Sequence, residues 1–141
     1  MPILDTEFIF GLNPSDPRHH DVIKVLEKIK TGEIKNVAVS DIALLETYIV
    51  LRNRGKTGAV KVIFQKINEI CKEYGIKEIK TLDKNLILRQ ISIENRHGAT
   101  FFDSLIAASA ETYDRSIISD DDVYDKLELK RISISGGGNG G

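Results

Sequence analysis

Short apolar runs alternate with stretches of helical periodicity along the whole chain. The apolar runs predict strands at residues 2–4, 37–39, 76–79, 116–119 and, more weakly, 129–134. Between them, apolar residues recur at intervals of three and four, which predicts helices over about 6–12, 17–30, 41–54, 57–74, 84–97 and 102–113, with a short helix near 123–127. Strands that alternate with helices favour an α/β domain whose parallel sheet is covered by helices on both faces.

Capping residues set the predicted helix boundaries. Asp16-Pro17 is typical of an N-cap followed by a first helical turn, and Ser40 or Asp41 caps the next long helix. Asp83 caps a helix that ends near His97-Gly98. The periodic positions of that helix are Leu86, Ile87, Gln90 and Ile91.

Length and composition bound the class of protein. The chain has 141 residues and a formal net charge of −1, so no overall basic character points to nucleic acid, although local patches can still bind it. We expect one domain over residues 1–134 and a flexible Gly-rich tail over 135–141. The single cysteine excludes an internal disulfide, and no signal peptide or membrane span is recognisable, so we expect a cytoplasmic protein without a membrane partner.

Four carboxylates lie either in apolar stretches, where burial of a charge is energetically unfavourable, or directly after predicted strands. Asp5 follows an apolar run, Glu46 lies within an apolar helical stretch, Asp103 opens another, and Asp121 follows the fourth predicted strand. Ligands of open parallel sheets bind beyond the carboxyl ends of the strands, at the point where the strand order reverses. If the first and fourth strands are neighbours there, all four acids reach one crevice.

Such a set of acids indicates a metal site. Hard oxygen ligands favour Mg²⁺ or Mn²⁺, and these ions retain waters that can be activated for phosphodiester cleavage. Two carboxylates held ~4 Å apart repel by about 4 kcal/mol at an effective dielectric constant near 20, so a cation stabilises the cluster.

The segments ILDT, LLETYIVL, FFDSLIAASA and IISDDDVY together resemble the PIN domain family, particularly its small VapC-type toxins, over residues 1 to about 134. The resemblance implies a three-layer α/β/α sandwich with a parallel five-stranded sheet in the order 3-2-1-4-5. It also implies a divalent-metal ribonuclease that acts on RNA, often as a homodimer. In a toxin, a partner antitoxin protein would restrain the activity.

The family pattern assigns roles residue by residue. Asp5-Thr6 matches the acid and hydroxyl residue after the first strand, Glu46 matches the acid of the helix after the second strand, and the motif D-x-x-I-A-A begins at Asp103. Ser119, Asp121 and Tyr124 match the last element.

The triplet 120–122 departs from that pattern. We favour Asp121 as a ligand and Asp120 as a possible supplement, with Asp122 solvated. Thr6 and Ser119 adjoin proposed ligands and could orient a carboxylate or a bound water.

Two further features have both a structural and a functional interpretation. The segment Arg52, Arg54 and Lys56, named here the basic turn, is either a solvated turn or a phosphate-binding element. The apolar stripe of helix 57–74 is most often core, but surplus apolar surface there would mark the dimer or antitoxin interface that the resemblance implies.

Three alternative functions follow from the same sequence. They are an RNA-processing housekeeping nuclease, a catalytically silent binding or assembly module, and a receiver-like phospho-acceptor. The last is disfavoured, because no lysine follows a late strand as expected and because it leaves Glu46 without a role.

Overall fold

A computed structural model describes residues 1–136, and the predicted tail beyond Gly136 lies outside the described residues. All five predicted strands form one parallel sheet in the order β3-β2-β1-β4-β5. The strands are β1 (Ile3–Leu4), β2 (Ala38–Ser40), β3 (Lys77–Ile79), β4 (Ser116–Ile118) and β5 (Lys130–Ile132). The predicted fold class and strand order are therefore confirmed.

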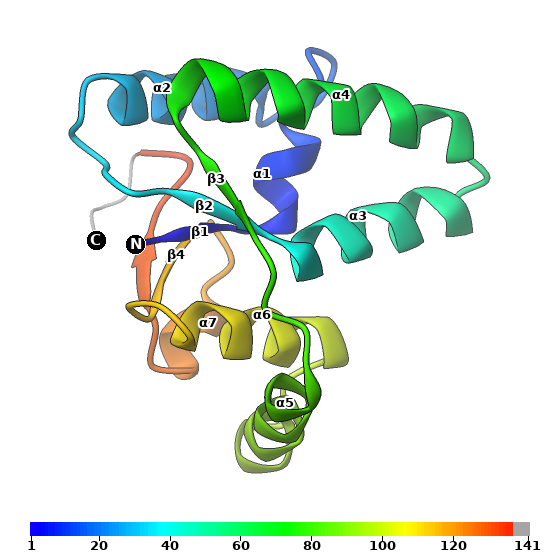
Figure 1. Ribbon diagram of the computed structural model, residues 1–141, viewed down its shortest axis with the longest axis vertical. Coiled ribbons are helices and arrows are strands. Elements are labelled where there is room, and N and C mark those ends of the chain that lie inside the picture. Colours follow the sequence, from blue (N-terminus) through cyan, green and yellow to red (C-terminus); the bar gives the residue numbers. More distant parts are fainter. Residues whose placement is uncertain (137–141) are drawn as a thin grey trace.

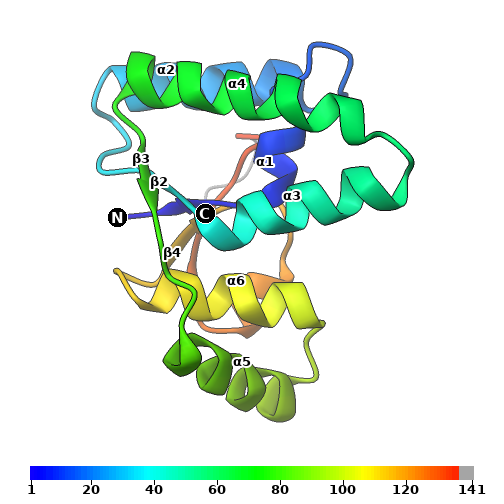
Figure 2. The ribbon, with the colours of Figure 1, turned by 45° about the vertical axis from the view of Figure 1, so that its right-hand side comes forward.

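Helices cover both faces of the sheet (Figures 1 and 2). They are α1 (Thr6–Phe10), α2 (His19–Lys30), α3 (Asp41–Asn53), α4 (Thr57–Tyr74), α5 (Lys84–His97), α6 (Phe101–Glu111) and α7 (Val123–Lys126). The helices α1, α2 and α4 lie on one face, and α5, α6 and α7 lie on the other. The remaining long helix, α3, extends beyond the carboxyl end of β2 and contacts α1, α4 and α6.

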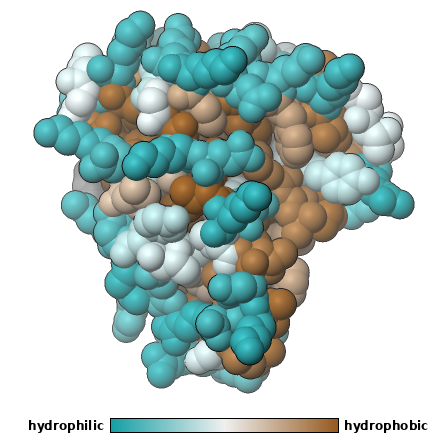
Figure 3. All heavy atoms as spheres, viewed as in Figure 1, coloured by the Kyte–Doolittle hydropathy of each residue, from teal (hydrophilic) through white to brown (hydrophobic). Residues whose placement is uncertain are grey.

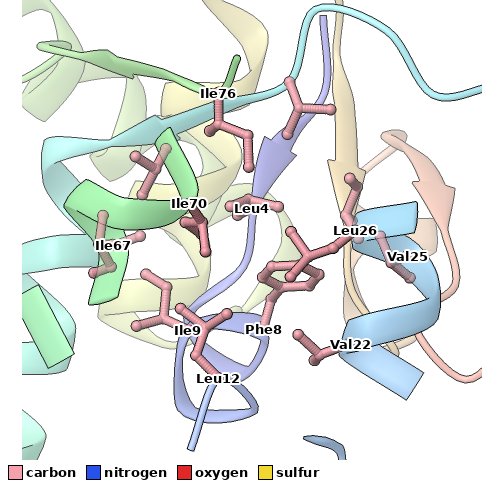
Figure 4. Close-up of a cluster of buried hydrophobic side chains, with 14 of the residues drawn as sticks. Leu4, Phe8, Ile9, Leu12, Val22, Val25, Leu26, Ile67, Ile70 and Ile76 are labelled. Atoms are coloured by element: carbon pink, nitrogen blue, oxygen red, sulfur yellow. The ribbon is translucent and has the colours of Figure 1, made fainter. Parts of the chain in front are cut away.

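The sheet separates two hydrophobic cores. Successive side chains of a strand point to opposite faces, so Leu4 packs with the α1, α2 and α4 residues drawn in Figure 4, while Ile3 packs against α6. Both residues are fully buried. β1 is thus a central strand, and Asp5 directly follows its two buried residues.

Two predicted caps are confirmed and one is wrong. The Ser40 hydroxyl accepts a hydrogen bond from the Ala43 amide at 3.3 Å, and the Asp83 carboxylate accepts one from the Leu86 amide at 2.8 Å. Helix α2 begins at His19 rather than after Asp16. The Asp16 carboxylate binds the amide and guanidinium of Arg18 instead, because residues 14–18 form turns.

The inward face of α5 also differs from expectation. Leu86, Gln90 and Ile93 are buried, whereas Ile87 and Ile91 are exposed. The apolar positions of this helix therefore occupy two faces, and only one of them packs against α6. None of the helices in residues 1–136 has the length and apolar character that crossing a bilayer requires.

Candidate active site

Asp5 lies where the strand order reverses. Chain connections lead from β1 to β2 and β3 on one side and then across to β4 on the other. The backbone of Asp5 is extended, and its amide donates to the Ile118 carbonyl of β4 at 3.1 Å. Its side chain caps α1 by accepting a hydrogen bond from the Thr6 amide at 2.8 Å. This carboxylate therefore stands at the carboxyl end of the central strand, where ligands of such sheets bind.

Hydrogen bonds hold the Asp5 carboxylate on both of its oxygens. The Ser119 hydroxyl donates to Oδ2 at 2.7 Å, and the Tyr124 hydroxyl donates to Oδ1 at 3.3 Å. The Thr6 amide donates to the same Oδ1. Ser119 is thus hydrogen-bonded to a carboxylate that the sequence proposes as a ligand. The Thr6 hydroxyl serves a different acid, because it donates to Glu46 Oε1 at 2.5 Å.

The other predicted acids approach from helices and a loop. Glu46 is half-buried on α3, and Asp103 is half-buried in the first turn of α6, where Thr100 forms the N-cap. Asp121 lies in the exposed loop after β4, and its carboxylate accepts a hydrogen bond from the Val123 amide at 3.0 Å. The four acids therefore come from four separate segments of the chain.

The electrostatics link these acids to one another. Burial raises the pKa of Asp5 to about 7, and the charges of Glu7 and Glu46 add to this rise. Burial also raises the pKa of Glu46, with a further contribution from Asp103, and burial raises the pKa of Asp103, with a contribution from Asp121. Within residues 1–136, none of the four predicted acids forms an ion pair with a Lys or Arg.

The donor chemistry fits a hard divalent cation. The four acids offer only oxygen ligands, and their shared negative charge lacks a protein cation partner in the described part of the chain. Within that part of the chain, no group of three or more His, Cys, Asp or Glu side chains is arranged so that it could hold a metal ion as it stands. The hydrogen bonds from Thr6, Ser119 and Val123 hold the carboxylates individually, so they share a region without converging.

One oxygen of the Asp120 carboxylate is held by the segment that follows β5. This Oδ1 atom accepts hydrogen bonds from the Ser133 hydroxyl at 2.9 Å, the Ile134 amide at 2.8 Å and the Ser135 amide at 3.0 Å. These contacts commit that oxygen to the segment after β5, and a role for Asp120 as a supplementary ligand stays a prediction. Asp122 is exposed, as expected for a solvated residue.

Glu7 is a residue that the sequence did not single out. Its Oε1 accepts a hydrogen bond from the Asp120 amide at 2.5 Å and lies 3.0 Å from Ser119 Oγ, whose single proton is donated to Asp5, and its Oε2 lies 3.7 Å from the Arg18 guanidinium. Glu7 therefore ties α1 to the loop after β4. The only available signal was its place two residues after Asp5, which does not distinguish it from a surface glutamate.

Tyr124 is the second residue whose role was missed. The sequence matched it only as an aromatic position, yet the side chain is buried and its hydroxyl reaches Asp5. Burial raises the pKa of Tyr124, and the charges of Asp5, Asp103, Glu46 and Asp121 raise it further. The phenol is thus a protonated donor among all four acids.

The basic turn lies at the far end of α3. All three of its residues are exposed. Arg52 donates to the Tyr48 hydroxyl at 3.3 Å, and the Arg54 guanidinium lies 6.0 Å from the centre of the Phe10 ring. The turn projects beyond the carboxyl ends of the strands, on the side of the molecule where α6 begins (Figures 1 and 2).

Comparisons with known proteins agree with this architecture. The family model described as PIN domain matches residues 3–130. A sequence search of curated proteins gave no match.

Three solved structures illustrate the shared fold. The Mycobacterium tuberculosis toxin VapC20, which cleaves the sarcin-ricin loop, aligns with a TM-score of 0.69 and 17% identity over 92% of this chain and 96% of its own. VapBC2 of Rickettsia felis, bound to a promoter DNA fragment, aligns with a TM-score of 0.67 and 15% identity over 93% of this chain and 96% of its own. A chain of a toxin-antitoxin complex from Klebsiella pneumoniae aligns with a TM-score of 0.63 and 12% identity over 95% of this chain and 98% of its own. At these identities the likeness concerns the fold.

Proposed function

The chain belongs to the PIN domain family, and we propose on that basis that it is a metal-dependent endoribonuclease that acts as the toxin of a toxin-antitoxin pair. The observation that carries this proposal is the group of acids at the strand-order reversal, whose negative charge has no cation partner among the described residues. The structural neighbours, which include a toxin that cleaves the sarcin-ricin loop, support it.

Each acid has a part in the proposed site. Asp5, Asp103 and Asp121 would hold Mg²⁺ or Mn²⁺, and Glu46 would hold either the ion or a water beside it. The bound ion would lower the pKa of a water and stabilise negative charge on the scissile phosphate. Thr6 and Ser119 keep Glu46 and Asp5 oriented through the hydrogen bonds described above.

The basic turn would bind the RNA backbone. It continues from the helix that carries Glu46, and its exposed guanidinium and ammonium groups suit contacts with phosphate oxygens. Such contacts would place the RNA along the carboxyl ends of the β-strands without recognising the base sequence of the RNA.

Cleavage of RNA by the purified protein tests the proposal. The parent protein should cut single-stranded RNA when Mn²⁺ is present and should stop when the ion is chelated. Asp103→Asn should reduce the rate by at least two orders of magnitude, because it removes an anionic ligand without changing volume. Asp122→Asn makes the same chemical change at an exposed position and should leave the rate unchanged. A parent protein that binds RNA but never cuts it would instead be a silent binding module.

A groove on the face of the molecule that carries α2 and α4 suits a segment of an antitoxin. It encloses about 580 Å³ between the end of α1, α2 and α4, and its apolar lining includes Leu12, Ile23, Val62, Ile63, Ile70 and Tyr74. Ile23 and Val62 remain exposed, so the stripe of α4 does carry apolar surface beyond what the core uses. An amphipathic peptide of the antitoxin would bury these side chains.

The exposed face of α5 suits a second copy of the chain. Ile87, Leu88 and Ile91 lie within about one helical turn of one another, and Leu82 precedes them, all at 44 to 63% exposure. Apolar surface is also visible in Figure 3 on the side of the molecule where α3 and α6 lie. Burial of these side chains in a two-fold interface would form the homodimer.

A further inference from the structure

Tyr124 occupies a position that packing alone does not explain. Its ring belongs to the core under α6 and is only 1% exposed, so a phenylalanine would fill the same space. A buried phenol needs a hydrogen-bond partner, and this one finds Asp5, a residue 119 positions away in the chain. The hydroxyl is therefore a feature of the acid site and not of the core.

The hydrogen bonds of Asp5 show what the hydroxyl does. An ionised carboxylate offers about four acceptor positions, two on each oxygen. The Thr6 amide and the Tyr124 hydroxyl occupy Oδ1, whereas Oδ2 receives only the Ser119 hydroxyl. The spare acceptor capacity of Asp5 is thereby confined to Oδ2.

The rest of the surroundings supports the same role. Tyr124 lies on α7 directly after the residue whose amide binds the Asp121 carboxylate. The phenol also lies near Asp103, because the charge of that carboxylate adds to the rise in the pKa of Tyr124, so one side chain adjoins two of the proposed ligands. A phenol does this without positive charge, whereas a lysine or arginine in its place would neutralise the cluster and compete with a cation.

We infer that Tyr124 is a positioning residue that fixes the Asp5 carboxylate so that Oδ2 binds the divalent ion, an inference that rests on the proposed metal-dependent function. The phenol does not take part in bond breaking. Its effect is to hold a ligand in one orientation before the ion arrives, as hydrogen-bond partners of metal ligands do.

The test compares Tyr124→Phe with Tyr113→Phe, which removes a hydroxyl from a tyrosine that is 40% exposed and lies just beyond the C-terminal end of α6. Mn²⁺ binding is measured by calorimetry on chelator-stripped protein without RNA. We expect Tyr124→Phe to weaken Mn²⁺ binding by roughly 10- to 100-fold, while Tyr113→Phe leaves it unchanged. Circular dichroism should show that both variants are folded.

Cleavage kinetics add a second readout. The Mn²⁺ concentration for half-maximal cleavage should rise by the same factor in Tyr124→Phe. At saturating Mn²⁺, the cleavage rate of this variant should reach that of the parent protein. Unchanged Mn²⁺ affinity, or an unfolded Tyr124→Phe protein, would overturn the inference by making the hydroxyl a structural element. A lower maximal rate at saturating Mn²⁺ with normal affinity would overturn it as well. A parent protein that binds Mn²⁺ without cutting RNA would refute only the nuclease function, because the binding comparison stands without RNA.

Discussion

Replacing Asp5 by asparagine should make the metal-free protein more stable at alkaline pH. In the folded chain, burial raises the pKa of Asp5 from 3.8 to about 7, and the neighbouring charges of Glu7 and Glu46 contribute. Ionising this buried carboxylate therefore opposes folding. The penalty is absent below the unfolded-state pKa, grows as the pH rises, and is complete above the folded-state pKa.

The magnitude follows from the displacement of the pKa. A change from 3.8 to about 7 corresponds to about 4 kcal/mol, as an upper bound on what ionisation of Asp5 costs the metal-free fold. Asparagine is neutral at every pH and keeps the volume. Its carbonyl can accept the hydrogen bonds of Thr6 and Tyr124, and its amide can donate to Ser119, whose hydroxyl then turns to Glu7 at 3.0 Å.

Denaturant unfolding of parent and Asp5→Asn proteins, both with chelator, measures the effect at about pH 5 and about pH 8. The difference between the two proteins isolates Asp5, because every other acid is common to both. We expect Asp5→Asn to be more stable by up to about 4 kcal/mol at the higher pH and the difference to shrink at the lower pH. Mn²⁺ should stabilise only the parent. A stability difference that is the same at both pH values, or a less stable variant at about pH 8, would refute the electrostatic account.

Three other predictions concern the ligands, the RNA contacts and the partners. Asp121→Asn should weaken Mn²⁺ binding and cleavage at least 10-fold, while Asp120→Asn should lower the melting temperature with little effect on Mn²⁺ affinity; calorimetry that shows the larger affinity loss at position 120 would reverse the assignment. Alanine at all three residues of the basic turn should weaken RNA binding across sequences and flatten its salt dependence, measured by fluorescence anisotropy, with Mn²⁺ affinity unchanged. Val62→Glu should prevent co-purification with an antitoxin encoded in the same operon, and Ile87→Glu should convert a dimer to a monomer in sedimentation analysis. Each of these two variants should leave the other interaction intact, because the groove and the α5 face are separate surfaces.

The amino-acid sequence by itself determined the order and type of the secondary-structure elements and the set of acids around which the site is proposed. Periodicity and capping are local properties, so the predicted caps at Ser40 and Asp83 agree with the structure. The strand order, which the family resemblance implied, agrees with it as well. The acid at position 5 was also recognisable, because a carboxylate directly after a buried apolar run has few structural explanations.

Only the tertiary structure decided which groups face one another. Asp120 and Asp121 are adjacent and chemically identical, and their surroundings differ because the segment after β5 supplies three donors to Asp120. The roles of Glu7 and Tyr124 depend on hydrogen bonds to residues more than a hundred positions away, and no local pattern contains such contacts. The exposed face of α5 has the same cause, since periodicity shows that a helix carries apolar residues but not which of them another helix will cover.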